Sequence, residues 1–122
     1  MKRLIAFFEI PAADFNRAVK FYEVVMDAKL NVMDCGHEKM AFFSDGICDN
    51  CGAISMAENF KPSKDGVLIS LSCNDIEKTL AAVTANGGQV GIPKTQIESE
   101  GAGFFATFFD SEGNRLGLWS EQ

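Results

Sequence analysis

The feature that most constrains the fold of this chain is an internal repeat. Asp14 opens a segment with apolar residues at helical spacing, and Asp75, which stands 61 positions later, opens a second such segment. This offset is half of the 122-residue chain, and aligning the two halves there superposes Phe15 on Ile76. A repeat that fills the chain predicts two structural units of the same kind, which pack together because one unit alone would leave a sheet face exposed.

Each half has the pattern of one strand, one helix and three further strands. The strand patterns are short apolar or alternating runs bounded by turn residues, at positions 4–10, 30–34, 39–43 and 52–56 in the first half and 67–72, 89–92, 104–109 and 115–120 in the second. At the second helix, Asn74 and Glu77 resemble a capping box. We therefore expect an α+β fold of two tandem βαβββ modules, about 1–60 and about 61–122, within a single domain covering 1–122.

The charge and hydropathy of the chain argue against two classes of partner. Its net charge is −6 and its Lys and Arg residues do not cluster, so we expect no nucleic-acid partner. No stretch approaches the ~20 apolar residues that cross a bilayer, so we expect no membrane partner. The apolar run near the start ends at Glu9, too early for a secretory signal. These observations predict a cytoplasmic protein.

A turn motif near the end of the chain leads into a strand whose side chains alternate. The stretch "FFDSEGNRLGLWS" places Arg115, Gly117 and Trp119 on one face of that strand. The middle position of this face is a glycine, which offers no side chain. By the same alternation, Phe7 and Glu9 share one face of the first strand.

Three segments, in order and at matching spacing, are similar to the vicinal oxygen chelate superfamily, the fold of glyoxalases, bleomycin-resistance proteins and extradiol dioxygenases. They are "FFEIPAADFNRAVKFYEVVM", "VLISLSCNDIEKTLAAVTANGGQV" and "FFDSEGNRLGLWS". The resemblance implies that the two modules form a half-open barrel around a central cavity, in a protein that is usually a homodimer. In the enzymes of this family, His, Glu or Gln side chains of the inner strands hold a divalent metal in the cavity.

The residues at the four positions that the resemblance implies for metal ligands are poor donors. Phe7, Leu68 and Gly117 occupy three of these positions, and Ser55 is the nearest oxygen on the remaining strand. Divalent metals need imidazole, thiolate or carboxylate donors, and the chain has a single histidine. We therefore predict no metal at the usual place and no cofactor.

Glu9 is the candidate catalytic residue, because a carboxylate that faces a cavity can orient a ligand or move a proton. The alternative is a rim carboxylate that is solvated or paired with Arg115. Arg115 could bind a carboxylate or phosphate and Trp119 could stack on a planar ligand. Alternatively, Trp119 covers the barrel end while Arg115 reaches water. The candidate ligand-binding residues are Phe7, Glu9, Leu68, Ser70, Arg115, Gly117 and Trp119.

Cysteines suggest a second metal hypothesis, which the spacing of the expected strands opposes. Cys48 and Cys51 have chelate spacing, but Cys35 and His37 lie at the other end of a strand that spans roughly 17–20 Å. One tetrahedral site cannot join them. Cys48 and Cys51 remain a redox pair, a metal site shared across a dimer, or incidental thiols.

Adjacent phenylalanines indicate what kind of cavity to expect. Four pairs fall in strands, and each pair sends one ring to either face; they are Phe7–Phe8, Phe42–Phe43, Phe104–Phe105 and Phe108–Phe109. If the cavity is open, it should be apolar and aromatic. These observations predict a glyoxalase-like protein that binds an apolar or aromatic, possibly cationic small molecule without the usual metal. One alternative is a glyoxalase- or dioxygenase-type lyase or isomerase that uses Glu9 as general base, with or without an unconventional metal site. The other is a structural remnant whose cavity is closed by phenylalanines.

Overall fold

The computed structural model describes residues 4–34, 36–43 and 52–122 of the chain. The first module contains β1 (Phe8–Pro11), α1 (Phe15–Val25), β2 (Leu30–Asp34), β3 (Glu38–Phe43) and β4 (Gly52–Ala57). The second contains β5 (Ser70–Ser72), α2 (Ile76–Ala85), β6 (Gln89–Val90), β7 (Thr95–Gln96), β8 (Phe104–Phe109) and β9 (Arg115–Ser120). Cys35, Cys48 and Cys51 lie outside the described residues, so the cysteine hypotheses stay predictions.

The two modules have the same topology, which confirms the predicted α+β fold with two βαβββ-like units. The strand order is β1-β4-β3-β2 in the first sheet and β5-β9-β8-β6 in the second, with β7 beside β8. In each sheet the first strand runs parallel to the last one, and the other neighbours are antiparallel. Within the described residues, no strand pairing joins the two sheets, so the half-open barrel stays a prediction.

Three strands are shorter than their sequence patterns predict. β1 begins at Phe8, and β5 is confined to Ser70–Ser72. The pattern at 89–92 forms a strand only at Gln89–Val90, because Gly91 and Ile92 both bond to Thr107: the Gly91 N–H donates to the Thr107 carbonyl, the Thr107 N–H donates to the Ile92 carbonyl, and the Thr107 hydroxyl accepts the Ile92 N–H at 2.8 Å. Pro93 follows, which has no N–H to donate to a sheet.

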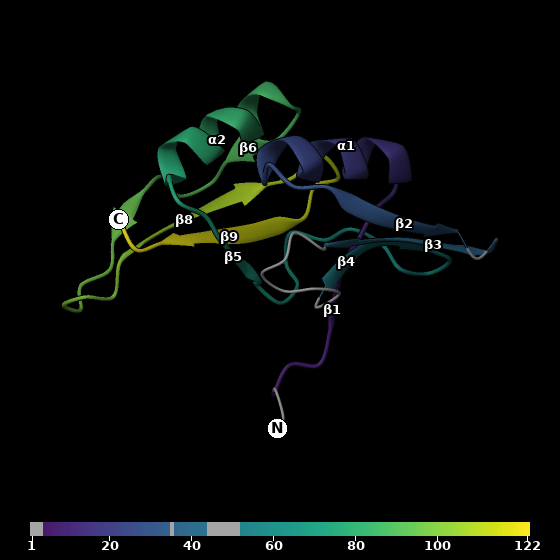
Figure 1. The fold of residues 1–122 in the computed structure, drawn as a ribbon, viewed down its shortest axis with the longest axis horizontal. Coiled ribbons are helices and arrows are strands. Elements are labelled where there is room, and N and C mark those ends of the chain that lie inside the picture. Colours follow the sequence, from purple (N-terminus) through teal and green to yellow (C-terminus); the bar gives the residue numbers. More distant parts are fainter. Residues whose placement is uncertain (1–3, 35, 44–51) are drawn as a thin grey trace.

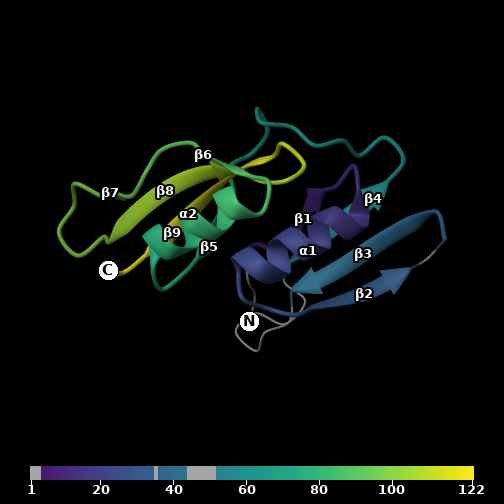
Figure 2. The same ribbon diagram turned by 90° about the horizontal axis from the view of Figure 1, so that it is seen from above.

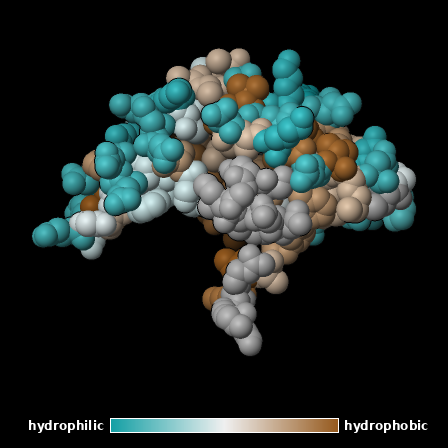
Figure 3. Space-filling model, in the orientation of Figure 1, coloured by the Kyte–Doolittle hydropathy of each residue, from teal (hydrophilic) through white to brown (hydrophobic). Residues whose placement is uncertain are grey.

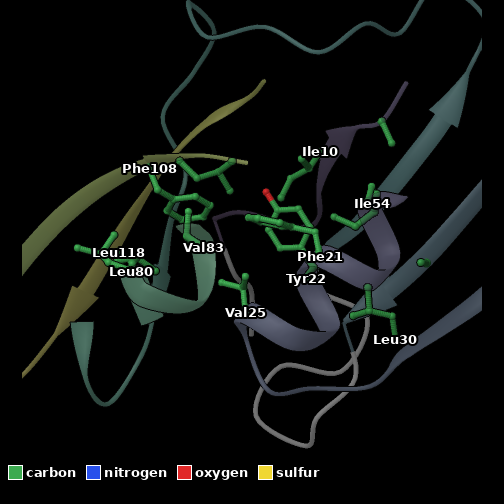
Figure 4. Close-up of a cluster of buried hydrophobic side chains, with 14 of the residues drawn as sticks. Ile10, Phe21, Tyr22, Val25, Leu30, Ile54, Leu80, Val83, Phe108 and Leu118 are labelled. Carbon is green, nitrogen blue, oxygen red and sulfur yellow. The ribbon is translucent and has the colours of Figure 1, made fainter. Parts of the chain in front are cut away.

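Both helices lie on the same side of the two sheets and contact each other, as Figure 1 shows. Seen from above, α1 and α2 lie side by side, each next to strands of its own module (Figure 2). Beneath them is a continuous cluster of buried apolar residues drawn from both modules, part of which Figure 4 shows. Phe21 of α1 packs against Phe108 of β8 with ring centroids 6.2 Å apart, so one core spans the two units.

The two aspartates that mark the repeat begin the two helices in the same way. The Asp14 carboxylate accepts the Arg17 N–H, and the Asp75 carboxylate accepts the Lys78 N–H, both at 3.1 Å. The N-cap of the second helix is therefore Asp75, and the capping box expected at Asn74 is wrong. Both helices need this cap because their first N–H groups have no partner within the helix.

The turn between β8 and β9, residues 110–114, is buried against the first module. The Asp110 carboxylate accepts the Tyr22 hydroxyl of α1 at 2.6 Å, and Asp110 is only 4% exposed. The Asn114 side chain donates to the Pro11 carbonyl at 2.8 Å and accepts the Ser63 N–H at 2.9 Å. One turn of the second module therefore binds the first strand, the first helix and the segment that links the modules.

Glu112, in the middle of this turn, binds backbone N–H groups at the N-terminus of α1. Its carboxylate accepts the N–H groups of Ala13 and Asp14 at 2.9 and 2.7 Å, and it forms an ion pair with Arg17 at 2.7 Å. Burial by itself would raise the pKa of Glu112, but the bonds from Arg17, Ser111 and these N–H groups together hold that pKa below its ordinary value. A negative charge is thus held at a helix N-terminus, where the helix dipole favours it.

None of the helices in the described part of the chain has the length and apolar character needed to cross a membrane.

Tyr22 is the single tyrosine of the chain, and its environment predicts alkaline sensitivity. Burial, followed by the charge and hydrogen bond of Asp110, raises the pKa of Tyr22 well above its ordinary value. Above pH ~10 the unfolded chain loses the tyrosine proton while the folded chain keeps it, so the free energy of unfolding falls as pH rises. We expect Tyr22→Phe to lose roughly 1–3 kcal/mol at pH 7 and to lose this alkaline slope. Chemical denaturation at pH 7 to 11 measures both, and an unchanged slope in the variant would contradict the assignment.

Candidate functional site

The face of the sheets opposite the helices, here called the open face, carries most of the predicted site residues. In β9, Leu116 and Leu118 are buried in the core beneath the helices. Regular alternation therefore places Arg115, Gly117 and Trp119 on the open face. In β1, Ile10 faces the core, so Phe7 and Glu9 take the open face in the same way.

The phenylalanine pairs divide between the faces as their positions in strands predict. Phe8 packs against the core, whereas the Phe7 ring lies beside Phe42 with centroids 5.8 Å apart. In β8, Phe108 is fully buried and its neighbour Phe109 is half-buried. The open face is therefore partly aromatic.

Gly117 is not an empty position, because the Ser70 side chain occupies the space beside it. The two residues are register partners in the parallel pair of β5 and β9. A side chain built on Gly117 would collide with the Ser70 hydroxyl and would come within 3.3 Å of its Cβ. Trp119 is 38% exposed and donates its indole N–H to the Ala102 carbonyl at 2.8 Å. Leu68 lies before β5 and is 44% exposed.

A pocket of about 250 Å³ lies where the two modules and their linker meet. β1 contributes Glu9 and Pro11, and the start of β9 contributes Asn114 and Arg115. The linker, residues 58–69, supplies further walls, among them Phe60, Lys61, Val67 and Ile69. The structure thus brings Glu9 and Arg115 to one pocket, whereas Phe7, Leu68, Ser70, Gly117 and Trp119 lie outside its lining.

Glu9 is held by a hydrogen bond and forms no ion pair within the described part of the chain, which rules out the predicted alternative of a Glu9–Arg115 pair. Its carboxylate accepts the Ser55 hydroxyl at 2.8 Å, and Ser55 is fully buried. Among the described residues, the Arg17–Glu112 pair is the single ion pair, so Glu9 and Arg115 are not paired directly. Glu9 is exposed, which agrees with the predicted alternative of a solvated carboxylate at the rim, and it lines the same pocket as Arg115 without forming an ion pair with it.

Sequence reasoning missed the contribution of the linker. Lys61 belongs to "FKPSKDG", which has no periodicity from which a facing direction could be predicted, and Val67 was expected to begin a strand, whereas β5 begins only at Ser70. The position of the linker between the two repeats could have predicted this contribution, because a segment that joins two modules has to cross their junction. Val67 is 88% exposed, an unusual position for an apolar side chain beside a pocket.

The Glyoxalase/Bleomycin resistance protein/Dioxygenase superfamily matches residues 4–118 of the chain. The chain belongs to this superfamily. A "Glyoxylase-like domain-containing protein" of Didymella fabae is 33% identical over an alignment of 113 residues, and the match covers 87% of this chain and 84% of that protein.

Solved structures of the superfamily fold resemble this one over nearly the whole chain. A mutant of glyoxalase I from Zea mays superposes with a TM-score of 0.74 at 20% identity, over 94% of this chain and 45% of that one. The chain thus spans about half the length of the maize enzyme. A hypothetical protein from S. aureus has a TM-score of 0.68 at 21% identity, over 98% and 97% of the two chains. The fosfomycin resistance protein FosX from Listeria monocytogenes, whose structure holds Mn(II) and sulfate, has a TM-score of 0.68 at 14% identity, over 98% and 91%.

At the positions that the resemblance implies for metal ligands, the side chains present offer a divalent ion few donor atoms. Phe7, Leu68 and Gly117 supply no donor atom, and the Ser55 hydroxyl is buried and donates to Glu9. Ser70 fills the space from which a ligand at position 117 would extend. Within the described part of the chain, no three His, Cys, Asp or Glu side chains lie close enough to hold a metal ion.

The packing of Ser70 into the space at Gly117 predicts a coupled effect on stability. We expect Gly117→Ala to lower the free energy of unfolding by about 1–3 kcal/mol, because the new methyl group collides with Ser70. Ser70→Gly removes the collision, so the double variant should lose clearly less than the sum of the single losses. Denaturant unfolding of the four proteins measures this coupling, and simple additivity would contradict the contact.

Proposed function

We propose that this glyoxalase-like protein binds a small molecule at the junction of its modules and does so without a metal at the superfamily's usual place. The observation that carries the proposal is the 250 Å³ pocket, to which both modules and the linker contribute. Pockets at such junctions are common ligand sites. Its walls combine apolar groups such as Phe60, Val67 and Ile69 with a few charged ones. This lining suits a ligand with an apolar or aromatic body.

A filled-pocket variant tests the binding function. Gly66 lines the pocket, and a side chain built there meets open space, so Gly66→Leu takes up pocket volume without a clash. Gly66→Ala is the matched control. We expect at least one member of a panel of cationic, neutral and anionic planar aromatics to raise the unfolding temperature. A ligand at 100 times its Kd adds about 2.7 kcal/mol of stability.

The expected pattern is binding by the wild type and Gly66→Ala, weaker binding by Gly66→Leu, and no change when EDTA is added. The metal-free proposal fails if EDTA abolishes binding and a divalent ion restores it. The binding function itself fails if no probe of any charge shifts the unfolding temperature.

A second candidate function is a lyase or isomerase reaction in which Glu9 serves as general base. The observation that favours it is the hydrogen bond from buried Ser55, which fixes one carboxylate oxygen and leaves the other free in the pocket. We expect Glu9→Gln to keep the affinity for an uncharged ligand and to abolish any turnover found with it. The assay measures the disappearance of substrate. Turnover that persists in Glu9→Gln would exclude this role.

We also propose a homodimer in which a second copy covers part of the open side. Met33 of β2 is 53% exposed, and Leu4 and Ile5 in the segment before β1 are 100% and 67% exposed. Figure 1 shows this segment leaving the body of the protein on the side opposite the helices. Hydrophobic surface also appears along it in the space-filling view (Figure 3). Apolar groups in such positions are typical of surfaces that bind a partner.

A further inference from the structure

We propose that the junction pocket selects small monocarboxylic acids with an apolar or aromatic body, which Arg115 and Lys61 hold by the carboxylate. This inference rests on the proposed binding function and adds the chemical class of the ligand to it. Its basis is the charge inside the pocket, which is opposite in sign to the charge of the chain.

Three charged side chains line the pocket, and they sum to one positive charge. Arg115 and Lys61 are cationic and Glu9 is anionic, whereas the whole chain carries a net charge of −6. Among the described residues, neither Arg115 nor Lys61 takes part in an ion pair. An arginine that lines a concave site without a carboxylate partner can form two parallel hydrogen bonds with the carboxylate of a ligand.

The Asn114 side chain is already occupied by hydrogen bonds within the protein, so the charged side chains and the Ser63 hydroxyl are the polar groups of the lining that remain to recognise the ligand. The Asn114 amide donates to the Pro11 carbonyl and to Asp110, and its oxygen accepts the Ser63 N–H. The Ser63 hydroxyl accepts the Asp65 N–H at 3.0 Å. The Asn114 side chain is therefore fixed in the pocket lining, and its hydrogen bonds also anchor the backbone next to Arg115.

The apolar walls and the volume set the size of the ligand body. Phe60, Val67 and Ile69 form one side, and Val67 is left 88% exposed when nothing covers it. A volume of 250 Å³ holds roughly eight to twelve non-hydrogen atoms, given a share of ~30 Å³ for one water molecule. A single ring with a short acidic side chain has about this size.

Glu9 limits the ligand to one negative charge. One of its oxygens accepts the Ser55 hydroxyl, and the other is free to accept an N–H or O–H group. A second carboxylate on the ligand would lie in the same small pocket as Glu9, and two like charges at that distance repel. The pocket should therefore discriminate against dicarboxylates as well as against neutral molecules.

Three probes that differ in charge test this selection on the wild-type protein: 3-phenylpropionate, 3-phenylpropionamide and benzylmalonate. They share one ring and chain and carry one, no and two negative charges at neutral pH. By calorimetry at low salt we expect the monoacid to bind about 10- to 100-fold more tightly than the amide, the range of a charge-assisted hydrogen bond. Benzylmalonate is larger than the monoacid by one carboxylate, so 2-benzylmalonamate, which has the same size and one charge fewer, is its control. Benzylmalonate should bind more weakly than both.

Variants that remove single charges test whether the preference for the acid over the amide arises in the pocket. Arg115→Gln should remove most of the preference for acid over amide, and Lys61→Gln should reduce it. Lys29→Gln, which removes one exposed charge outside the pocket lining, should leave the preference unchanged. Glu9→Gln should narrow the gap between benzylmalonate and the monoacid.

Each outcome separates this inference from the binding function on which it rests. If acid and amide bind equally and Gly66→Leu weakens both, the binding function stands and the monocarboxylate selection is overturned. If the dicarboxylate binds as tightly as the monoacid, or Arg115→Gln and Lys61→Gln both keep the full preference, the selection is likewise overturned. If no probe of any charge binds, the binding function fails together with the inference.

Discussion

The buried carboxylate of Asp110 is the interaction on which the arrangement of the two modules depends. It accepts the hydroxyl of Tyr22 from the first module and the side-chain amide of Asn114 from its own turn. A buried carboxylate is stable only when its oxygens are hydrogen-bonded. Separating the turn from the first module would therefore expose the Asp110 carboxylate or leave it without its Tyr22 partner. Glu112 adds to the same attachment by accepting the first N–H groups of α1.

This attachment also determines where a ligand site can form. Asn114 is the last residue of the turn, and Arg115 is the first residue of β9. Because Asn114 is bound to Pro11 and to the linker, Arg115 is brought beside β1 and its Glu9. The pocket thus forms where the hydrogen bonds of Asn114 join the modules. Within a fold shared with many superfamily members, the charges at this junction, rather than a metal, distinguish the site we propose.

Membership in the superfamily fixes the architecture of this protein more firmly than its chemistry. The solved structures that it resembles include a glyoxalase and a fosfomycin resistance protein, all at sequence identities of 21% or less. At the usual metal positions this chain has a phenyl ring, a leucine and a glycine. The space beside that glycine is taken by the Ser70 side chain.

The sequence by itself determined the duplication, the two helices and the alternation of β9, because these follow from local spacing and from helix-capping chemistry. Alternation also placed Glu9 on the same face of its strand as Phe7, and Arg115 on the same face of its strand as Gly117, since alternation is a local property. That the two faces turn to the same cavity was implied by the resemblance to the superfamily. Only the tertiary structure decided that Ser70 fills the space at Gly117, that Lys61 and Val67 join the pocket, and that residues 110–114 hold the modules together. These are contacts between segments far apart in the chain, and no spacing within one segment encodes which surface another segment will meet.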